Sequence, residues 1–185
     1  VRFIGNHSTG KMGIAIAEAC KERGASVTLV LGPSNEAVPP GIELLRVRAA
    51  QEMYDACLDR FDDTDIAIMS AAVADYTPVQ VAAEKIKKKD DALTLELKKT
   101  PDILRKLGQL KKPGQFLAGF ALETNNEKEY ALGKLRSKNA DIIIMNSLND
   151  KGAGFGHDTN KITIFDKAGN EFAFETKSKK EVAAD

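Results

Sequence analysis

The chain has 185 residues, which is long enough to bury the core of one α/β domain over residues 1–185. Its 27 basic and 27 acidic residues give a formal net charge of zero, so the charge balance favours neither nucleic acid nor an anionic membrane as a partner. No apolar run approaches the ~20 residues that span a bilayer. Cys20 and Cys57 fall within helical patterns, and we expect free thiols in a reducing cytoplasm. A strand begins abruptly at Val1 and a charged segment stops at Asp185, so we expect a piece of a longer protein.

The first 13 residues carry the most informative pattern in the chain. Residues 1–4 read as a short apolar strand, residues 5–13 as a turn of small and polar residues, and residues 14–23 as a helix. A helix N-terminus offers unpaired N–H groups and a partial positive charge to an anion, and glycines let a phosphate approach the backbone. The spacing of Gly5 and the later Gly-Lys pair matches a Walker A loop, but Met12 stands where a Ser or Thr would hold magnesium. A phosphate site and a tight turn without a ligand both remain open.

Apolar strands and helices then alternate, which is typical of a parallel sheet covered on both faces. The second strand ends in Leu31, Gly32 and Pro33, where a dinucleotide-binding fold usually places an acidic residue that holds the ribose. An NAD(P)-dependent oxidoreductase is therefore disfavoured. We predict an α/β fold, a Rossmann-like, doubly wound, mainly parallel sheet with β-hairpin excursions. Its strands are expected at 25–31, 41–47, 65–70, 115–120 and 140–145, and its later helices at 49–61, from Pro101 onward and at 127–138.

Two segments interrupt this alternation. Residues 82–97 lack helical periodicity and read as two strands about a turn of Lys and Asp, with leucines alternating near the end. This hairpin would act as a flap, as a subunit contact or as both. Its lysines, which include Lys85, are either a solvated edge or a clamp for an anion. A second hairpin is predicted over residues 161–175, followed by Ser178 as the N-cap of a last helix.

The strand at 65–70 runs into an alanine-rich segment, residues 71–76, which we expect at the same sheet edge as the opening turn. Ligands of open α/β sheets bind beyond the carboxyl ends of the strands. Small side chains would let a flat group approach the backbone, and Asp75 offers a carboxylate to a base, a ribose or a metal; alternatively, Asp75 is a helix N-cap. Lys134 and Lys138 stand one helical turn apart, and by themselves they would be ordinary surface lysines.

Six collinear blocks form a pattern that is far more specific than any lone glycine motif. They are residues 6–13 (NHSTGKMG), 71–76 (AAVADY), 84–88 (EKIKK), 101–104 (PDIL), 119–121 (GFA) and 123–126 (ETNN). In this order and spacing they resemble the phosphopantothenoylcysteine synthetase family of coenzyme A biosynthesis, which in bacteria is commonly the C-terminal half of a bifunctional flavoprotein. The resemblance covers essentially the whole chain.

The resemblance implies a ligase. In that family the carboxylate of 4′-phosphopantothenate attacks the α-phosphate of CTP to give an acyl-cytidylate and pyrophosphate, and L-cysteine then displaces CMP to form the amide. The resemblance also implies Mg²⁺ as the counter-ion of CTP, with unknown protein ligands, and a homodimer joined by the hairpins. A flavin-dependent decarboxylase half often precedes this domain, so we expect no FMN here. The alternatives are a ligase that uses ATP, an NAD(P)-dependent oxidoreductase and a non-catalytic nucleotide-binding module.

The resemblance further implies roles for individual residues. Asn6 matches an asparagine placed against the acyl intermediate, and Lys85 matches a lysine that grips the triphosphate, so both are candidate catalytic residues. Arg2 matches an arginine for substrate phosphate or dimer geometry, with a plain surface arginine as the alternative. Ala71 and Ala72 would line the substrate pocket. The nucleotide-binding positions are Met69, Ser70, Ala71, Asp75, Lys85, Pro101, Asp102, Ile103, Leu104, Phe120, Lys134 and Lys138.

Overall fold

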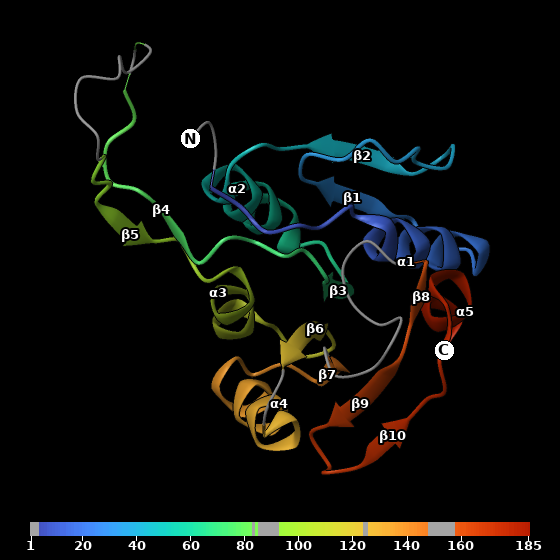
Figure 1. Ribbon diagram of the computed structural model, residues 1–185. Coiled ribbons are helices and arrows are strands. Elements are labelled where there is room, and N and C mark those ends of the chain that lie inside the picture. The colour runs from blue at the N-terminus through green and yellow to red at the C-terminus, as the bar shows by residue number, and fades with distance from the viewer. Residues whose placement is uncertain (1–3, 83, 85–92, 124–125, 148–157) are drawn as a thin grey trace.

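The computed structural model describes residues 4–82, 84, 93–123, 126–147 and 158–185 (Figure 1). Its helices are α1 (Lys11–Glu22), α2 (Ala50–Phe61), α3 (Ile103–Leu110), α4 (Glu127–Ser137) and α5 (Lys179–Ala184). Its strands are β1 (Thr28–Leu31), β2 (Glu43–Arg46), β3 (Ile66–Met69), β4 (Tyr76–Pro78), β5 (Leu97–Lys99), β6 (Phe116–Glu123), β7 (Ile142–Ser147), β8 (Thr159–Asn160), β9 (Ile162–Asp166), β10 (Glu171–Ala173) and β11 (Lys177–Ser178). The alternation of strands and helices that the sequence predicts is confirmed from α1 onward.

A five-stranded sheet in the order β10-β9-β7-β6-β3 forms the centre of the chain. Strands β3, β6 and β7 run parallel to one another, and β9 and β10 add two antiparallel strands at one edge. Strands β1 and β2 form a parallel ladder of their own. The predicted parallel arrangement is therefore confirmed at the centre of the sheet. The parallel strands form two separate sheets, one with β3, β6 and β7 and the other with β1 and β2.

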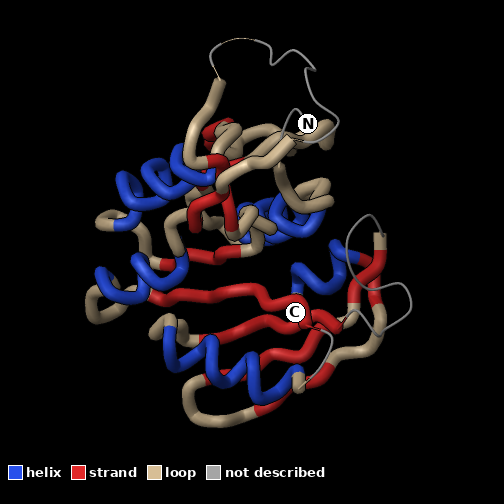
Figure 2. Tube along the Cα trace, turned by 60° about the vertical axis from the view of Figure 1, so that its left-hand side comes forward, coloured by secondary structure: helices blue, strands red, loops and turns tan. Residues whose placement is uncertain are grey.

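Both faces of the central sheet are covered, because alternate residues of a strand point to opposite sides. Leu117 of β6 packs in an apolar cluster with residues of α2, α3 and α4. The next residue, Ala118, belongs to a second cluster with Val182 of α5, against which Met12 of α1 packs. Figure 2 shows helices flanking the central strands. These two clusters constitute the double winding that the sequence predicts.

The structure describes only Ile4 of the predicted first strand, residues 1–4. Residues 4–9 form no strand, and Ile4 is 40% exposed, while residues 1–3 lie outside the described residues. Gly5 and the polar residues after it give a sheet few apolar side chains to bury, so little favours a ladder here. Helix α1 instead begins at Lys11, earlier than predicted.

The paired strands of the first hairpin flank the predicted span of 82–97 and share only Leu97 with it. These strands are β4 and β5, with Tyr76 opposite Lys99, and residues 85–92 lie outside the described residues. Leu93 is 60% exposed and belongs to no strand. An isolated two-stranded ribbon is marginal in water, so the alternating leucines do not by themselves extend the ladder. The hairpin projects from the body of the chain (Figure 1), and its roles as a flap and a subunit contact stay predictions.

The second hairpin, predicted over 161–175, is confirmed by the antiparallel pair β9 and β10. Strand β9 also pairs with β7, so this hairpin extends the central sheet. The predicted N-cap of the last helix is confirmed as well: Oγ of Ser178 accepts a hydrogen bond from the backbone N–H of Glu181 at 3.2 Å.

Candidate functional site

The opening segment and the exit of β3 meet at one edge of the sheet, as the sequence predicts. Nδ2 of Asn6 donates hydrogen bonds to the backbone carbonyls of Ala72 (3.3 Å) and Val73 (3.2 Å). At the same edge α1 passes so close to β3 that a Cβ on Gly13 would lie 3.0 Å from Oγ of Ser70. The glycine keeps the helix and the strand in close approach. These contacts bring the opening turn and the alanine-rich segment into one candidate site.

The N-terminus of α1 is open to an anion. Its N-cap is Gly10, whose φ of +81° suits glycine and which has no side-chain oxygen to cap the helix. The N–H group of Lys11 reaches Oγ1 of Thr9 only at 3.4 Å. The N–H groups of the first helical turn have no partner within a helix, so they are available at this edge of the sheet. The phosphate site at this turn stays a prediction, as does the turn without a ligand.

The N-terminus of α3 carries a side-chain cap and a lysine. Oδ1 of Asp102 accepts a hydrogen bond from the backbone N–H of Arg105 at 3.0 Å, and Oδ2 pairs with Nζ of Lys138. Partial burial raises the pKa of Asp102, but the hydrogen bonds from Lys138 and Arg105 outweigh it, so the pKa lies below its ordinary value. The side chain of Lys138 is 16% exposed. The alternative of an ordinary surface lysine is therefore wrong at this position.

The side chains of Ile103 and Leu104 face the core. Each residue is 8% exposed and belongs to the apolar cluster under α2, α3 and α4. A Cβ on Gly119 would lie 2.6 Å from Cδ2 of Leu104, so α3 packs closely on β6 through this glycine. A nucleotide contact at Ile103 or Leu104 must therefore come from the backbone N–H groups at the start of α3. The prediction that the helix begins at Pro101 is wrong, because Asp102 takes the N-cap position and the helix begins at Ile103.

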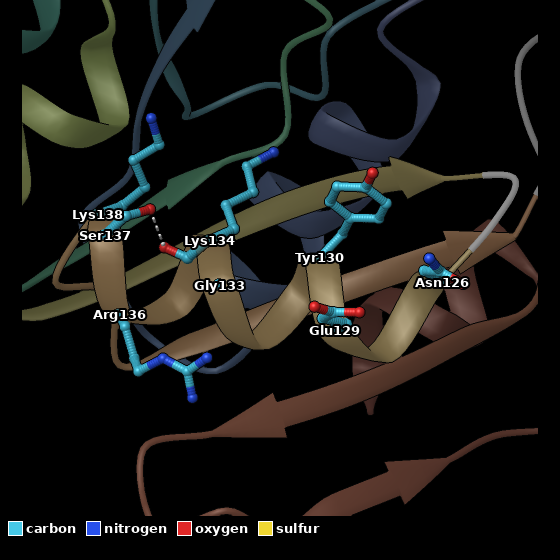
Figure 3. A pocket seen from close by; sticks show the side chains of 8 residues that line it. All are labelled: Asn126, Glu129, Tyr130, Gly133, Lys134, Arg136, Ser137 and Lys138. Carbon is cyan, nitrogen blue, oxygen red and sulfur yellow. Dashed lines mark hydrogen bonds between the residues drawn. The ribbon is translucent and has the colours of Figure 1, made fainter.

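Lys134 and Phe120 lie in contact. Nζ of Lys134 donates a hydrogen bond to the backbone carbonyl of Phe120 at 2.8 Å. The ring of Phe120 packs against the cluster on the opposite face of the sheet, so Phe120 meets Lys134 through its backbone alone. Figure 3 shows Lys134 and Lys138 projecting to the same side of α4. The two lysines thus bring positive charge to one side of this helix.

The exit of β3 is tied to the segment that precedes α3. Thr100 donates from its backbone N–H to the carbonyl of Asp75 (2.9 Å) and from Oγ1 to the carbonyl of Ala74 (2.7 Å). Strand β4 begins at Tyr76, so the alternative that Asp75 caps a helix is wrong. Asp75 is exposed at the candidate site.

The remaining predicted residues divide by their exposure. Ala71 is exposed and Ala72 is half-buried, so both offer small side chains at the edge. Met69 is half-buried and packs against the core. Arg2 and Lys85 lie outside the described residues, and their roles stay predictions.

Sequence reasoning missed two asparagines near this edge. Asn146 lies near the end of β7, and its Oδ1 is buried with no hydrogen-bond partner in the described ranges. Asn160 of β8 is 1% exposed and places Nδ2 at 3.9 Å from Sδ of Met12 in α1. An unpartnered buried acceptor costs about 1–3 kcal/mol, so Asn146 marks a place for a water molecule or a ligand group. The signal was a polar residue directly after the predicted strand end at Met145.

Three further features of the described residues concern metal ligands, membrane spans and the thiol of Cys57. No three of their His, Cys, Asp or Glu side chains lie close enough together to hold a metal ion. None of the helices they form is long and apolar enough to cross a membrane. Burial raises the pKa of Cys57 to about 11, which agrees with the predicted core thiol.

Comparisons with known proteins agree with one another. A family model described as the DNA/pantothenate metabolism flavoprotein C-terminal domain matches residues 1–185. The chain is 51% identical over 186 residues to a cysteine/cysteine sulfinic acid decarboxylase from an unknown prokaryotic organism, in a match that covers 100% of the chain and 52% of that protein. It is 48% identical over 184 residues to the coenzyme A biosynthesis bifunctional protein CoaBC of Bacillus subtilis (strain 168), covering 99% of the chain and 45% of that protein.

A solved structure shows the same architecture. The crystal structure of the C-terminal domain of coenzyme A biosynthesis bifunctional protein CoaBC matches with a TM-score of 0.82 and 40% identity, over 99% of this chain and 82% of that one. The chain spans about half the length of the curated relatives that it matches. Fold, sequence and the six blocks therefore agree, and the chain belongs to the family of DNA/pantothenate metabolism flavoprotein C-terminal domains.

Proposed function

We propose that the chain is a phosphopantothenate–cysteine ligase of coenzyme A biosynthesis that activates its acid substrate with CTP. The observation that carries this proposal is the edge where Asn6 joins the opening turn to the exit of β3, beside the uncapped N-terminus of α1. The family match and the similarity to the bifunctional protein CoaBC support the same reaction.

The reaction has two steps. In the first, a carboxylate oxygen of 4′-phosphopantothenate bonds to the α-phosphorus of CTP, and the bond to the departing pyrophosphate breaks. In the second, the amine of L-cysteine bonds to the acyl carbon, CMP leaves with the former carboxylate oxygen, and the amine gives up a proton. A free carboxylate is a poor acyl donor, and the cytidylate supplies the leaving group that it lacks. The site must therefore hold a carboxylate against a triphosphate, which requires N–H donors and cations.

Asn6 is the residue that we place against the acyl group. Its two contacts to the carbonyls of Ala72 and Val73 are long, at 3.3 and 3.2 Å. The side-chain amide has two N–H bonds, so one can hold the backbone while the other meets the acyl oxygen. Ala71 and Ala72 leave room for the pantothenate chain beside it. Arg2 would bind the phosphate of this substrate or shape the subunit contact.

The nucleotide would lie between the N-terminus of α3 and the lysine side of α4. The backbone N–H groups that begin α3 and the side chains of Lys134 and Lys138 supply donors and positive charge for the phosphates. Lys85 would grip the triphosphate from the hairpin. Asp75 and the buried Oδ1 of Asn146 are acceptors for ribose or amino groups.

Mg²⁺ would enter with the nucleotide and neutralise phosphate charge. We expect this cation to be held mainly by phosphates and water. Asp75 is an exposed carboxylate at the edge that could reach the cation or one of its waters. No step in the reaction requires FMN in this domain.

Several partners follow from the same proposal. The curated relatives are about twice as long as the chain, which supports a flavin-dependent decarboxylase half fused to this domain in the full protein. We assign the decarboxylase activity in one relative's name to that other half. A homodimer joined by the hairpins and a cytoplasmic location are further parts of the proposal. A ligase that uses ATP is the nearer alternative, and an NAD(P)-dependent oxidoreductase the remoter one.

Pyrophosphate release tests the proposal. The chain is incubated with 4′-phosphopantothenate, L-cysteine and Mg²⁺, and release is compared between CTP and ATP. Release that depends on phosphopantothenate and prefers CTP is the expected result, and a preference for ATP would replace CTP in the proposal. No release from folded protein with either nucleotide, together with measurable binding of NAD(P), would favour the oxidoreductase instead.

A further inference from the structure

The two parallel ladders of the structure meet the same end of α1 without pairing with each other. In the described part of the chain β1 pairs only with β2, and β3 pairs only with β6 among the central strands. A Cβ on Gly10 would lie 3.0 Å from Cδ1 of Leu31, the last residue of β1. A Cβ on Gly13 would lie 3.0 Å from Oγ of Ser70, which follows β3. The carboxyl ends of β1 and β3 therefore lie at the same edge, and the two strands run in the same direction.

The edge of β1 that faces away from β2 has unpaired backbone groups. Along a strand of a parallel ladder, successive residues direct their N–H and C=O groups to alternate sides. The carbonyl of Leu31 accepts a hydrogen bond from the N–H of Val47 at 3.0 Å, so Leu31 faces the β2 side. Thr28 and Val30 therefore face the other side, where no described residue pairs with their backbone groups.

The edge of β3 that faces away from β6 is unpaired in the same way. The carbonyl of Asp65 accepts a hydrogen bond from the N–H of Phe116 at 2.8 Å, so Ile66 and Ile68 direct their backbone groups away from β6. The described residues supply no partner for these groups. Ile66 is also 61% exposed, although strands of a parallel sheet are ordinarily buried on both faces. Apolar edges with unpaired N–H and C=O groups are templates for a further strand.

The two edges belong to one layer of the fold. Val30 of β1 and Met69 of β3 pack against the same apolar cluster, to which α2 contributes Met53 and Phe61. In Figure 1 the chain enters α1 between β1 and β3. One helix thus covers both edges, and the start of another reaches both of their carboxyl ends.

The order of the strands indicates which segment belongs between these edges. A doubly wound sheet commonly has the order 3-2-1-4-5-6, in which strand 1 directly precedes the first helix. Here β2 and β1 correspond to positions 3 and 2, and β3, β6 and β7 correspond to positions 4, 5 and 6. Position 1 has no strand among the described residues. Residues 4–9 do not form it, because they contain no strand and Asn6 ties them to the carboxyl edge at Ala72.

A strand at position 1 needs more chain than residues 1–3. Each of its two neighbours, β1 and β3, is four residues long. The match to the C-terminal domain of the bifunctional protein CoaBC covers 82% of that chain, so that domain has residues outside the match. The curated relatives are about twice as long as this chain. A segment of the longer protein is therefore a better candidate for this position than a second copy of the chain.

We propose that a strand from the part of the longer protein that precedes Val1 lies between β1 and β3, parallel to both. It would join the two ladders into one sheet. Its carboxyl end would lie between Leu31 and Ser70, at the edge where Asn6 meets the exit of β3. Because ligands of such sheets bind beyond the carboxyl ends of the central strands, the residues after this strand would complete the candidate site.

The test measures amide hydrogen exchange in the longer natural protein, resolved to single residues by NMR. The amides of Val30 and Ile68 face the proposed strand, and those of their neighbours Leu29 and Ala67 face β2 and β6 and serve as controls. All four should exchange at rates within roughly tenfold of one another, because all four are then paired inside one sheet. Nuclear Overhauser effects from the amides of Val30 and Ile68 should lead to residues that precede Val1.

Exchange at Val30 and Ile68 that is more than roughly tenfold faster than at the two controls would overturn the inference, because these edges would then be open to solvent. Nuclear Overhauser effects that lead only to residues of a second copy would also overturn it, since strand exchange between copies would then fill the position. Neither result depends on ligase activity, so the proposed function is tested separately by pyrophosphate release.

Discussion

Two aspartates at opposite ends of the central sheet each bind a lysine and a backbone N–H group, but one cluster is closed and the other is open. Asp141 lies at the amino end of β7, where it accepts hydrogen bonds from Nζ of Lys111 (2.8 Å) and from the backbone N–H of Leu117 (2.7 Å). Nζ of Lys167 lies 3.0 Å from the same carboxylate. The side chains of Asp141 and Lys111 are 20% and 10% exposed.

Asp102 marks the opposite, carboxyl edge. Its side chain is 44% exposed, and its lysine partner, Lys138, lies on the same side of α4 as Lys134. The uncapped N-terminus of α1 and the exposed Ala71 lie at this edge as well. The same pairing of aspartate with lysine therefore has two roles. At the amino end of the sheet the charges stabilise the fold, and at the carboxyl end they lie where a ligand can bind.

The largest effect that would sharpen this comparison is expected at Asn6, on the open edge. Asn6→Asp removes the N–H donors that we place at the acyl oxygen, so the rate of amide formation should fall by about 10²-fold. The first step should continue, so a burst of pyrophosphate and an accumulated acyl-cytidylate should appear in quenched samples. Thermal unfolding should be little changed, because Asn6 is exposed. Unchanged overall turnover would contradict the proposed role of Asn6 in amide formation.

The next effect is expected at the closed cluster. Asp141→Asn removes the charge that two lysines share, and the free energy of unfolding should fall by about 2 kcal/mol, measured by urea denaturation. Turnover at 25 °C should be the same as in the wild type, since Asp141 lies away from the site.

Asp62→Asn provides the matched control. Asp62 pairs with Lys112 at 2.9 Å, but its side chain is 78% exposed, so the loss should stay below about 0.5 kcal/mol. Equal losses in the two variants would show that the cluster around Asp141 is an ordinary surface network. The contrast between the two ends of the sheet would then fail.

A smaller effect is expected for Lys138→Gln, which removes a positive charge from the open edge. The KM for CTP should rise roughly tenfold, because a charge-assisted contact to phosphate is replaced by a neutral one. Lys128→Gln is the control on the same helix, since Lys128 pairs with Glu171 at 2.5 Å on the exposed surface. A KM that rises equally in both variants would indicate a general loss of charge and not a site contact.

The smallest effect is the dependence of stability on pH. Burial raises the pKa of Asp141, but the hydrogen bonds from Lys111, Leu117 and Lys167 outweigh it and hold the pKa below its ordinary value. A carboxyl whose pKa is lowered by folding adds stability above its unfolded pKa, which is 3.8, and this stability is lost as the pH falls through the folded pKa. The melting temperature should therefore fall below about pH 4 less steeply in Asp141→Asn than in the wild type. Identical slopes would contradict the assignment.

The sequence predicted the elements whose patterns are long and apolar. Strands β6 and β7, helices α2 and α4 and the hairpin of β9 and β10 appear where periodicity indicates them. The opening strand stays a prediction, because only Ile4 of its four residues is described, and Ile4 lies in no strand. The hairpin at 82–97 was misplaced because its leucines alternate without a layer of chain to pack against, whereas pairing requires only the short segments beside it.

The sequence predicted where the candidate site lies better than it predicted which atoms make its contacts. Small residues after β3 and the glycines before α1 indicated one shared edge, and Asn6 joins the two segments there. A motif match does not say which atom of a residue faces the ligand, so the buried side chain of Leu104 was not foreseen. The six sequence blocks also do not include Asn146. Its unpartnered Oδ1 is recognised only once the packing around it is known.

The measurement that tests the account most directly follows the oxygen atoms of the carboxylate. The chain is given 4′-phosphopantothenate labelled with ¹⁸O in its carboxylate, together with CTP, Mg²⁺ and L-cysteine, and the nucleotide product is analysed by mass spectrometry. The account predicts CMP that carries one ¹⁸O atom, because the carboxylate oxygen stays on the α-phosphorus when the amine displaces it. Unlabelled CMP, or label found in inorganic phosphate, would contradict an acyl-cytidylate formed at this edge of the sheet.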